Sequence, residues 1–128
     1  MPKVTRDPDL TGVHVLVVED DPDSLDMVVS ILRWSGAMVS SANNARTGLT
    51  AARHARPHVV VTDIALPGED GYWLADQLRR TSPNVPVIAV SAFRPREQVH
   101  TPFSRYFTKP IEPVDLCRAV GEVTGPRA

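Results

Sequence analysis

Apolar positions along the chain alternate between short runs rich in β-branched residues and stretches with helical spacing. Three apolar runs are too short for a helix and too continuous for a half-exposed strand, so they predict strands buried on both faces. They lie in residues 14–18, 58–63 and 85–90. Residues 38–42 and 105–108 are more polar or shorter, and they predict two further strands.

Four stretches with helical spacing follow the first, second, third and fifth of these strands. Their apolar positions recur every three or four residues, as on one face of a helix. The stretches are residues 25–32, 45–55, 74–78 and 116–123. Pro22 and Gly36 stand where the first helix would begin and end, and Pro57 stops the second. Strands that alternate with helices predict a doubly wound α/β fold, a five-stranded parallel sheet with helices on both faces and the two polar strands at its edges.

The length of 128 residues fits one compact domain. A chain of this size buries roughly two thirds of the surface that it exposes when unfolded, which is enough for a core without disulfides or a structural metal. Residues 1–12 are polar and contain two prolines, so they predict an N-terminal tail. Residues 125–128 predict a C-terminal tail, and the domain is expected to span residues 13–124. The single cysteine, Cys117, has apolar neighbours and is expected to be a buried structural thiol.

Charge and hydropathy exclude several classes of function. Lys and Arg number 14 and Asp and Glu 15, so the net charge of −1 argues against direct binding of nucleic acid. The apolar runs are far shorter than the roughly 20 residues that a membrane-spanning helix needs. The N-terminus also lacks the apolar core of a signal peptide, so we expect a cytoplasmic protein.

Polar residues follow four of the predicted strands directly. In an open parallel sheet this is the edge at which ligands bind. The residues are Glu19, Asp20 and Asp21 after the first strand, Asp63 after the third, Ser91 after the fourth and Lys109 after the fifth. Carboxylates gathered there would repel and raise one another's pKa unless they shared a cation, and oxygen ligands favour Mg²⁺. An isolated acidic run is more often a solvated loop, and Asp21 is expected to cap the first helix, but Asp63 and Lys109 in register favour a site.

Four motifs occur in a fixed order along the chain: an acidic pair, an Asp-x-x-x-Pro-x-x-x-Gly loop, a strand-ending Ser-Ala and a Lys-Pro. They lie in residues 15–21, 61–71, 87–92 and 106–110. With these motifs, residues from about 13 to 123 resemble the receiver domain of two-component response regulators, of the type found in chemotaxis regulators. The resemblance implies a flavodoxin-like sheet with strand order 2-1-3-4-5.

The resemblance also implies the chemistry of the site. Asp63 would accept a phosphoryl group from a phosphohistidine on a histidine kinase or a histidine phosphotransfer protein, and the domain would later hydrolyse the acyl phosphate. Glu19, Asp20 and Asp63 would hold Mg²⁺, together with the backbone carbonyl of Ala65. Such a domain catalyses only its own phosphorylation and dephosphorylation.

Three further residues have roles in the resemblance. Lys109 would pair with one phosphoryl oxygen and Ser91 would hydrogen-bond another. Tyr106 matches the switch aromatic, which turns inward in the phosphorylated state, and Lys109-Pro110 matches a cis peptide bond.

The sequence departs from the family pattern at several positions. Glu19 stands where aspartate is usual, Ala65 offers no side chain to the site, and Phe93 can obstruct an attacking water. The connection between Ser91 and Lys109 is shorter than usual by about one helical turn. We therefore expect a shortened fourth helix, with residues 92–104 irregular or mobile, and a monomer in place of a dimer formed through that face.

Two other functions share part of this pattern. A phosphohydrolase of the haloacid dehalogenase type also uses an aspartate nucleophile with Mg²⁺ and lysine, although its nucleophile follows the first strand. A receiver-like module that binds partners without phosphorylation would keep the fold and lose the chemistry.

Overall fold

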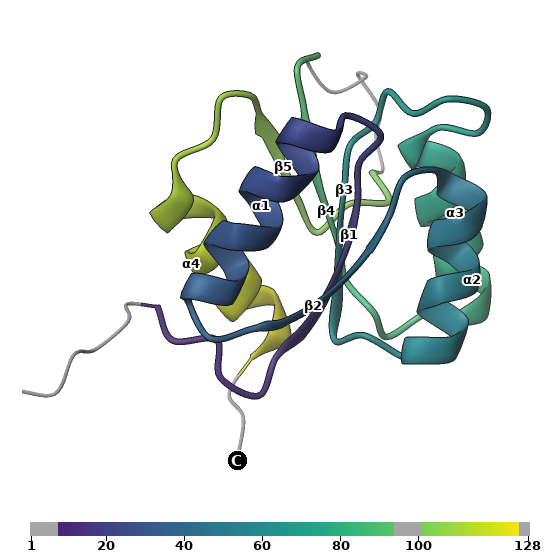
Figure 1. Cartoon of the computed structure of the whole chain (residues 1–128). Coiled ribbons are helices and arrows are strands. Elements are labelled where there is room, and N and C mark those ends of the chain that lie inside the picture. The colour runs from purple at the N-terminus through teal and green to yellow at the C-terminus, as the bar shows by residue number, and fades with distance from the viewer. Residues whose placement is uncertain (1–7, 94–100, 126–128) are drawn as a thin grey trace, which may run out of the picture.

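The computed structural model describes residues 8–93 and 101–125, which form a three-layer α/β fold (Figure 1). The elements in chain order are β1 (His14–Val18), α1 (Pro22–Trp34), β2 (Met38–Ala42), α2 (Ala45–Ala55), β3 (Val59–Thr62), α3 (Gly71–Thr81), β4 (Val87–Ser91), β5 (Arg105–Thr108) and α4 (Pro113–Thr124). All neighbouring strands pair in parallel, in the order β2-β1-β3-β4-β5. The predicted fold class and strand order are confirmed.

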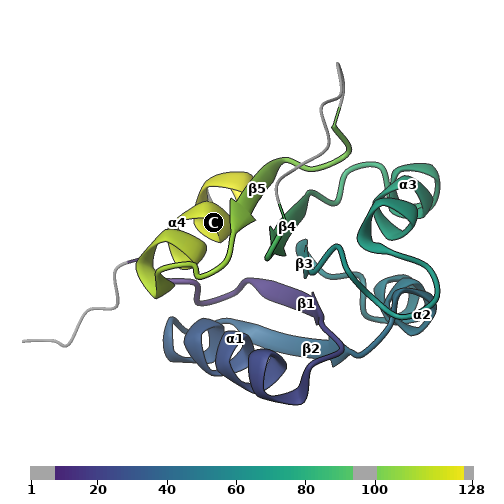
Figure 2. The ribbon, with the colours of Figure 1, turned by 90° about the horizontal axis from the view of Figure 1, so that it is seen from above.

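The sheet separates two hydrophobic cores. Figure 2 shows α1 and α4 on one face of the sheet and α2 and α3 on the other. Successive residues of a strand point to opposite faces, so Val15 and Val17 of β1 enter the core beneath α1 and α4, whereas Leu16 and Val18 enter the core beneath α2 and α3. Because both faces are covered, the central strands are apolar at nearly every position.

Helix α1 begins and ends where the sequence predicted. The Asp21 side chain accepts a hydrogen bond from the Ser24 amide and caps the helix. Hydrogen bonding by the Ser24 side chain, and then by its amide, lowers the pKa of Asp21. Pro22 occupies the first turn. Gly36 follows the helix with a φ of 102°, a conformation that glycine adopts without steric cost.

Strand β4 is displaced from its predicted position of 85–90. The Val85 amide donates to the Ser82 carbonyl in the turn after α3, and Pro86 has no amide hydrogen. Pairing therefore begins at Val87 and extends to Ser91. The displacement brings Ser91 into the sheet as its last residue in this strand.

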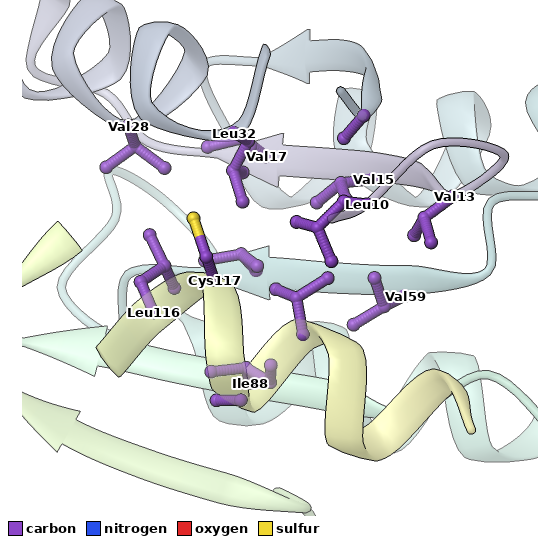
Figure 3. Packing of buried hydrophobic residues seen from close by; sticks show 14 of the residues in the cluster. Leu10, Val13, Val15, Val17, Val28, Leu32, Val59, Ile88, Leu116 and Cys117 are labelled. Atoms are coloured by element: carbon purple, nitrogen blue, oxygen red, sulfur yellow. The ribbon is translucent and has the colours of Figure 1, made fainter. Parts of the chain in front are cut away.

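The predicted N-terminal tail of residues 1–12 was wrong at Leu10. This side chain has no exposed surface and belongs to the core beneath α1 and α4 (Figure 3). The Leu10 amide also donates to the Ser35 carbonyl at 2.7 Å, just after α1. One leucine among polar neighbours carries no periodic signal, so the sequence pattern did not reveal this contact.

Cys117 is buried on α4, as predicted, and faces α1 in Figure 3. The Ser35 hydroxyl donates to its sulfur at 3.1 Å. Burial raises the pKa of the thiol, and the hydrogen bond from Ser35 only partly opposes this effect.

The predicted irregular segment of residues 92–104 falls mainly on residues 94–100, which lie outside the described residues. Residues 92–93 and 101–104, which the structure does describe, belong to no helix or strand. Within the described parts of the chain, no helix is both long enough and apolar enough to cross a membrane.

Candidate functional site

The candidate site lies at the carboxyl ends of β1, β3, β4 and β5. Backbone hydrogen bonds continue past the strand ends and hold the site residues in register. The Asp63 amide donates to the Val18 carbonyl at 3.0 Å, and the Lys109 amide donates to the Ser91 carbonyl at 2.8 Å. The parallel sheet therefore places Asp63 beside the residue that follows β1, and Lys109 beside the end of β4.

Lys109 joins the carboxylates of two strands. Its Nζ donates to Glu19 Oε1 at 2.7 Å and to Asp63 Oδ2 at 3.0 Å. The side chains of Glu19 and Asp63 are only 6% and 11% exposed, whereas that of Lys109 is 29% exposed. The two ion pairs are thus shielded from solvent on the carboxylate side and open on the lysine side.

Three carboxylates meet beside this lysine. Oxygen atoms of Glu19, Asp20 and Asp63 lie within 4.8 Å of one another, and Asp20 is exposed to solvent. Within the described residues, these carboxylates share the positive charge of Lys109, so negative charge exceeds positive charge at the site. Oxygen donors in such a cluster fit a hard divalent cation such as Mg²⁺.

The surroundings shift the pKa values of two of these groups. Burial raises the pKa of Glu19, and the negative charge of Asp63 adds to this, although the hydrogen bond from Lys109 opposes both. Burial alone would lower the pKa of Lys109, but its hydrogen bonds to Glu19 and Asp63 outweigh burial and raise it. Lys109 therefore stays charged, and its single positive charge does not balance the three carboxylates.

Backbone amides orient the buried carboxylates. Glu19 Oε2 accepts hydrogen bonds from the amides of Asp20 and Asp21 at 2.9 and 3.4 Å. Asp63 Oδ1 accepts one from the Ala65 amide at 3.2 Å. In both Glu19 and Asp63, one carboxylate oxygen is therefore fixed by backbone amides and the other faces Lys109. Glutamate at position 19, where aspartate is usual, still places an oxygen in contact with the lysine.

Ser91 and Tyr106 are both bonded to the backbone of one residue, Phe93. Ser91 is fully buried, and its Oγ accepts a hydrogen bond from the Phe93 amide at 3.3 Å. The Tyr106 hydroxyl donates to the Phe93 carbonyl at 2.9 Å, and its ring packs edge-on against Phe103. The Lys109–Pro110 peptide bond is cis, as the resemblance implied.

Two residues beside Asp63 were not predicted as part of the site. The Thr62 hydroxyl donates to the Asp63 carbonyl at 2.8 Å, and Gly71 packs against the same carbonyl. In the sequence, Gly71 stands out only as the last residue of the Asp-x-x-x-Pro-x-x-x-Gly motif. The sequence signal available for Thr62 was a hydroxyl residue at the end of an otherwise aliphatic strand.

The chain is similar to several proteins of known sequence. The chain is 34% identical over 117 residues to an uncharacterised 14.6 kDa protein of Leptolyngbya boryana, covering 87% of this chain and 89% of the relative. It is 32% identical over 111 residues to the DNA-binding response regulator MtrA of Mycolicibacterium smegmatis, covering 84% of this chain. The match takes in only 48% of MtrA, about half the length of that regulator.

A solved structure has the same fold. The receiver domain of the sensor histidine kinase PA1611 from Pseudomonas aeruginosa PAO1, solved with a magnesium ion coordinated in its active-site cleft, matches with a TM-score of 0.81. The match covers 91% of this chain and 100% of that domain at 24% sequence identity. A sequence model of the response regulator receiver domain matches residues 15–121, and the chain therefore belongs to the response regulator receiver domain family of two-component systems.

Proposed function

We propose that this chain is a phosphoacceptor switch in which Asp63 receives a phosphoryl group from a phosphohistidine. The observation that carries the proposal is the contact of Lys109 with both Glu19 and Asp63, beside a third carboxylate from Asp20. A buried carboxylate nucleophile, a fixed cationic side chain and a cation-binding cluster are the parts that phosphoryl transfer needs.

The transfer forms one bond to phosphorus and breaks another. An Asp63 carboxylate oxygen attacks the phosphorus atom and the bond from phosphorus to the imidazole nitrogen breaks. That nitrogen keeps the electron pair, and the imidazole, protonated on its other ring nitrogen, leaves in its neutral form. Water later attacks the acyl phosphate, which releases inorganic phosphate and restores the carboxylate. Lys109 offsets negative charge on the moving oxygens at both steps.

The residues that would hold Mg²⁺ are Glu19, Asp20 and Asp63, with the backbone carbonyl of Ala65. When bound, Mg²⁺ supplies charge neutralisation to the phosphoryl oxygens. Magnesium in the PA1611 receiver domain supports this assignment. Ser91 would donate its hydroxyl to a phosphoryl oxygen, and Tyr106 would change position with the phosphorylation state.

The proposed partner is a histidine kinase or a histidine phosphotransfer protein, and the proposed setting is the cytoplasm. The protein turns over only its own phosphoryl group and acts as a monomer. Phosphohydrolase activity of the haloacid dehalogenase type is the competing chemistry, and assays with small phosphomonoesters separate the two. No release of phosphate from those esters is expected.

The direct test uses acetyl phosphate with Mg²⁺ and intact-mass measurement. Wild type is expected to gain one phosphoryl group that is lost under mild base, and Asp63→Asn is expected to gain none. Asp76→Asn, which alters an exposed aspartate on α3, is the matched control and should be labelled like wild type. Equal labelling of wild type and Asp63→Asn would contradict the proposal.

A further inference from the structure

The backbone of Asp63 contacts three residues that lie outside the carboxylate cluster. Its amide donates to the Val18 carbonyl of β1 at 3.0 Å. Its carbonyl accepts from the Thr62 hydroxyl at 2.8 Å and lies against Gly71, the first residue of α3. Both backbone polar groups of Asp63 are therefore hydrogen-bonded, one to a neighbouring strand and the other to a buried side chain.

The contact with Gly71 leaves no room for a side chain. A Cβ added at position 71 would lie 2.5 Å from the carbonyl oxygen of Asp63 and 2.9 Å from Cα of Ile64. Both obstacles are backbone atoms, so no side-chain rotation relieves the overlap. The separation would have to grow by about half an ångström or more before the contact became tolerable.

The start of α3 is itself fixed and does not yield easily. The Gly71 amide donates to the Ile64 carbonyl at 2.9 Å. The Asp70 side chain caps the helix by accepting from the Trp73 amide at 2.9 Å. Displacement caused by a larger residue at position 71 would thus pass to the segment that follows Asp63.

From these contacts we infer that Gly71 and Thr62 are positioning residues, which set where the Asp63 carboxylate stands relative to the acidic cluster and Lys109. This inference rests on the proposed function of Asp63. Thr62 is 1% exposed, so its hydroxyl has no solvent to bond with in place of the Asp63 carbonyl. Gly71 acts through the close approach of its backbone.

The test compares Gly71→Ala and Thr62→Val with wild type in two measurements. Titration with MgCl₂ alone, followed by amide chemical shifts, is expected to show about tenfold weaker binding in both variants, as is typical when a group that orients a metal ligand is altered. Phosphorylation by acetyl phosphate is expected to be about tenfold to a hundredfold slower, because small displacements of a reacting group are costly.

Three further variants separate positioning from general destabilisation. Thr62→Ser keeps the hydroxyl and is expected to retain Mg²⁺ affinity. Gly121→Ala places a Cβ in ordinary contact with Leu10 at 3.7 Å and should behave like wild type. Leu10→Ala removes a buried side chain from the opposite core, so it should lower stability without changing Mg²⁺ affinity.

The outcomes are distinct for the two proposals. Wild-type affinity and rate in folded Gly71→Ala and Thr62→Val would overturn the inference. If Gly71→Ala does not fold, Thr62→Val decides the question alone, since it adds no volume. If wild type binds Mg²⁺ but accepts no phosphoryl group, the proposed function fails, and the Mg²⁺ titrations still decide whether these residues position Asp63.

Discussion

At the scale of single residues, the site contains three carboxylates and one lysine, so negative charge exceeds positive charge. Glu19, Asp20 and Asp63 converge, and Lys109 contacts two of them. Burial is the main cause of the raised pKa of Glu19, and the negative charge of Asp63 adds to it. Cation binding and lysine contact are therefore separable properties, and two substitutions can test them one at a time.

Asp20→Asn is expected to remove the stabilisation by Mg²⁺. A ligand that binds only the folded state stabilises by about 2.7 kcal/mol at a hundred times its Kd. Wild type should thus show a rise in Tm with MgCl₂, and Asp20→Asn should show little or none. Asp23→Asn, an exposed aspartate in the first turn of α1, is the control and should keep the wild-type rise. An unchanged response in Asp20→Asn would contradict the metal site.

Lys109→Ala is expected to leave Mg²⁺ binding intact while it disrupts the response to phosphorylation. Loss of the ammonium makes the cluster more negative, so the Kd for Mg²⁺ should stay the same or fall by a few fold. Amide shifts near Tyr106 after treatment with acetyl phosphate should be much smaller than in wild type. A full wild-type pattern of shifts in Lys109→Ala would show that this lysine does not link the site to β5.

At the scale of elements, strand and helix existence followed from periodicity, and the deviations have local causes. The pattern predicted β4 from Val85 because Val85 is apolar, but a turn takes its amide. Glu19, Asp63 and Lys109 were found because strand ends in a parallel sheet share one edge. Thr62 and Gly71 were missed because their contribution depends on a backbone distance, which residue type does not encode.

Cys117 lies in the contact between α1 and α4. Its thiol is expected to make folding stability depend on pH in the alkaline range. Burial raises the pKa of this thiol in the folded state above its ordinary value of 9.0. Well below pH 9.0 both states hold the proton, and the contribution of the thiol to stability is constant. As the pH rises further, the unfolded chain loses the proton first, so folding stability falls, with a limiting slope of about 1.4 kcal/mol per pH unit.

Urea unfolding of wild type and Cys117→Ala between neutral and alkaline pH measures this effect. The difference in unfolding free energy between the two proteins should be constant up to about pH 8 and should then change in favour of the alanine variant. Other groups that titrate in this range cancel in the difference. A difference that does not vary with pH would mean that the thiol ionises equally in both states.

At the scale of the whole molecule, two hydrophobic cores on opposite faces of the sheet both stabilise the fold. The core beneath α1 and α4 begins with Leu10, ahead of the first strand. Leu10→Ala is expected to lower the unfolding free energy by about 2–5 kcal/mol, the range for large-to-small changes in a core. Met27→Ala, at a position 57% exposed, should change it by less than about 0.5 kcal/mol. Equal urea midpoints for the two variants would contradict the placement of Leu10.

The ion pair between Lys109 and Glu19 joins residues 90 positions apart in the chain. During synthesis, a chain that ends after α3 already contains Glu19, Asp20 and Asp63 but lacks Lys109. Such a fragment lacks the group that offsets charge in phosphoryl transfer, so an incomplete product would be a poor acceptor. The lysine that pairs with these carboxylates therefore joins the site only after the chain has extended past β5, and truncation before Lys109 is expected to remove phosphoryl acceptance along with the ion pairs.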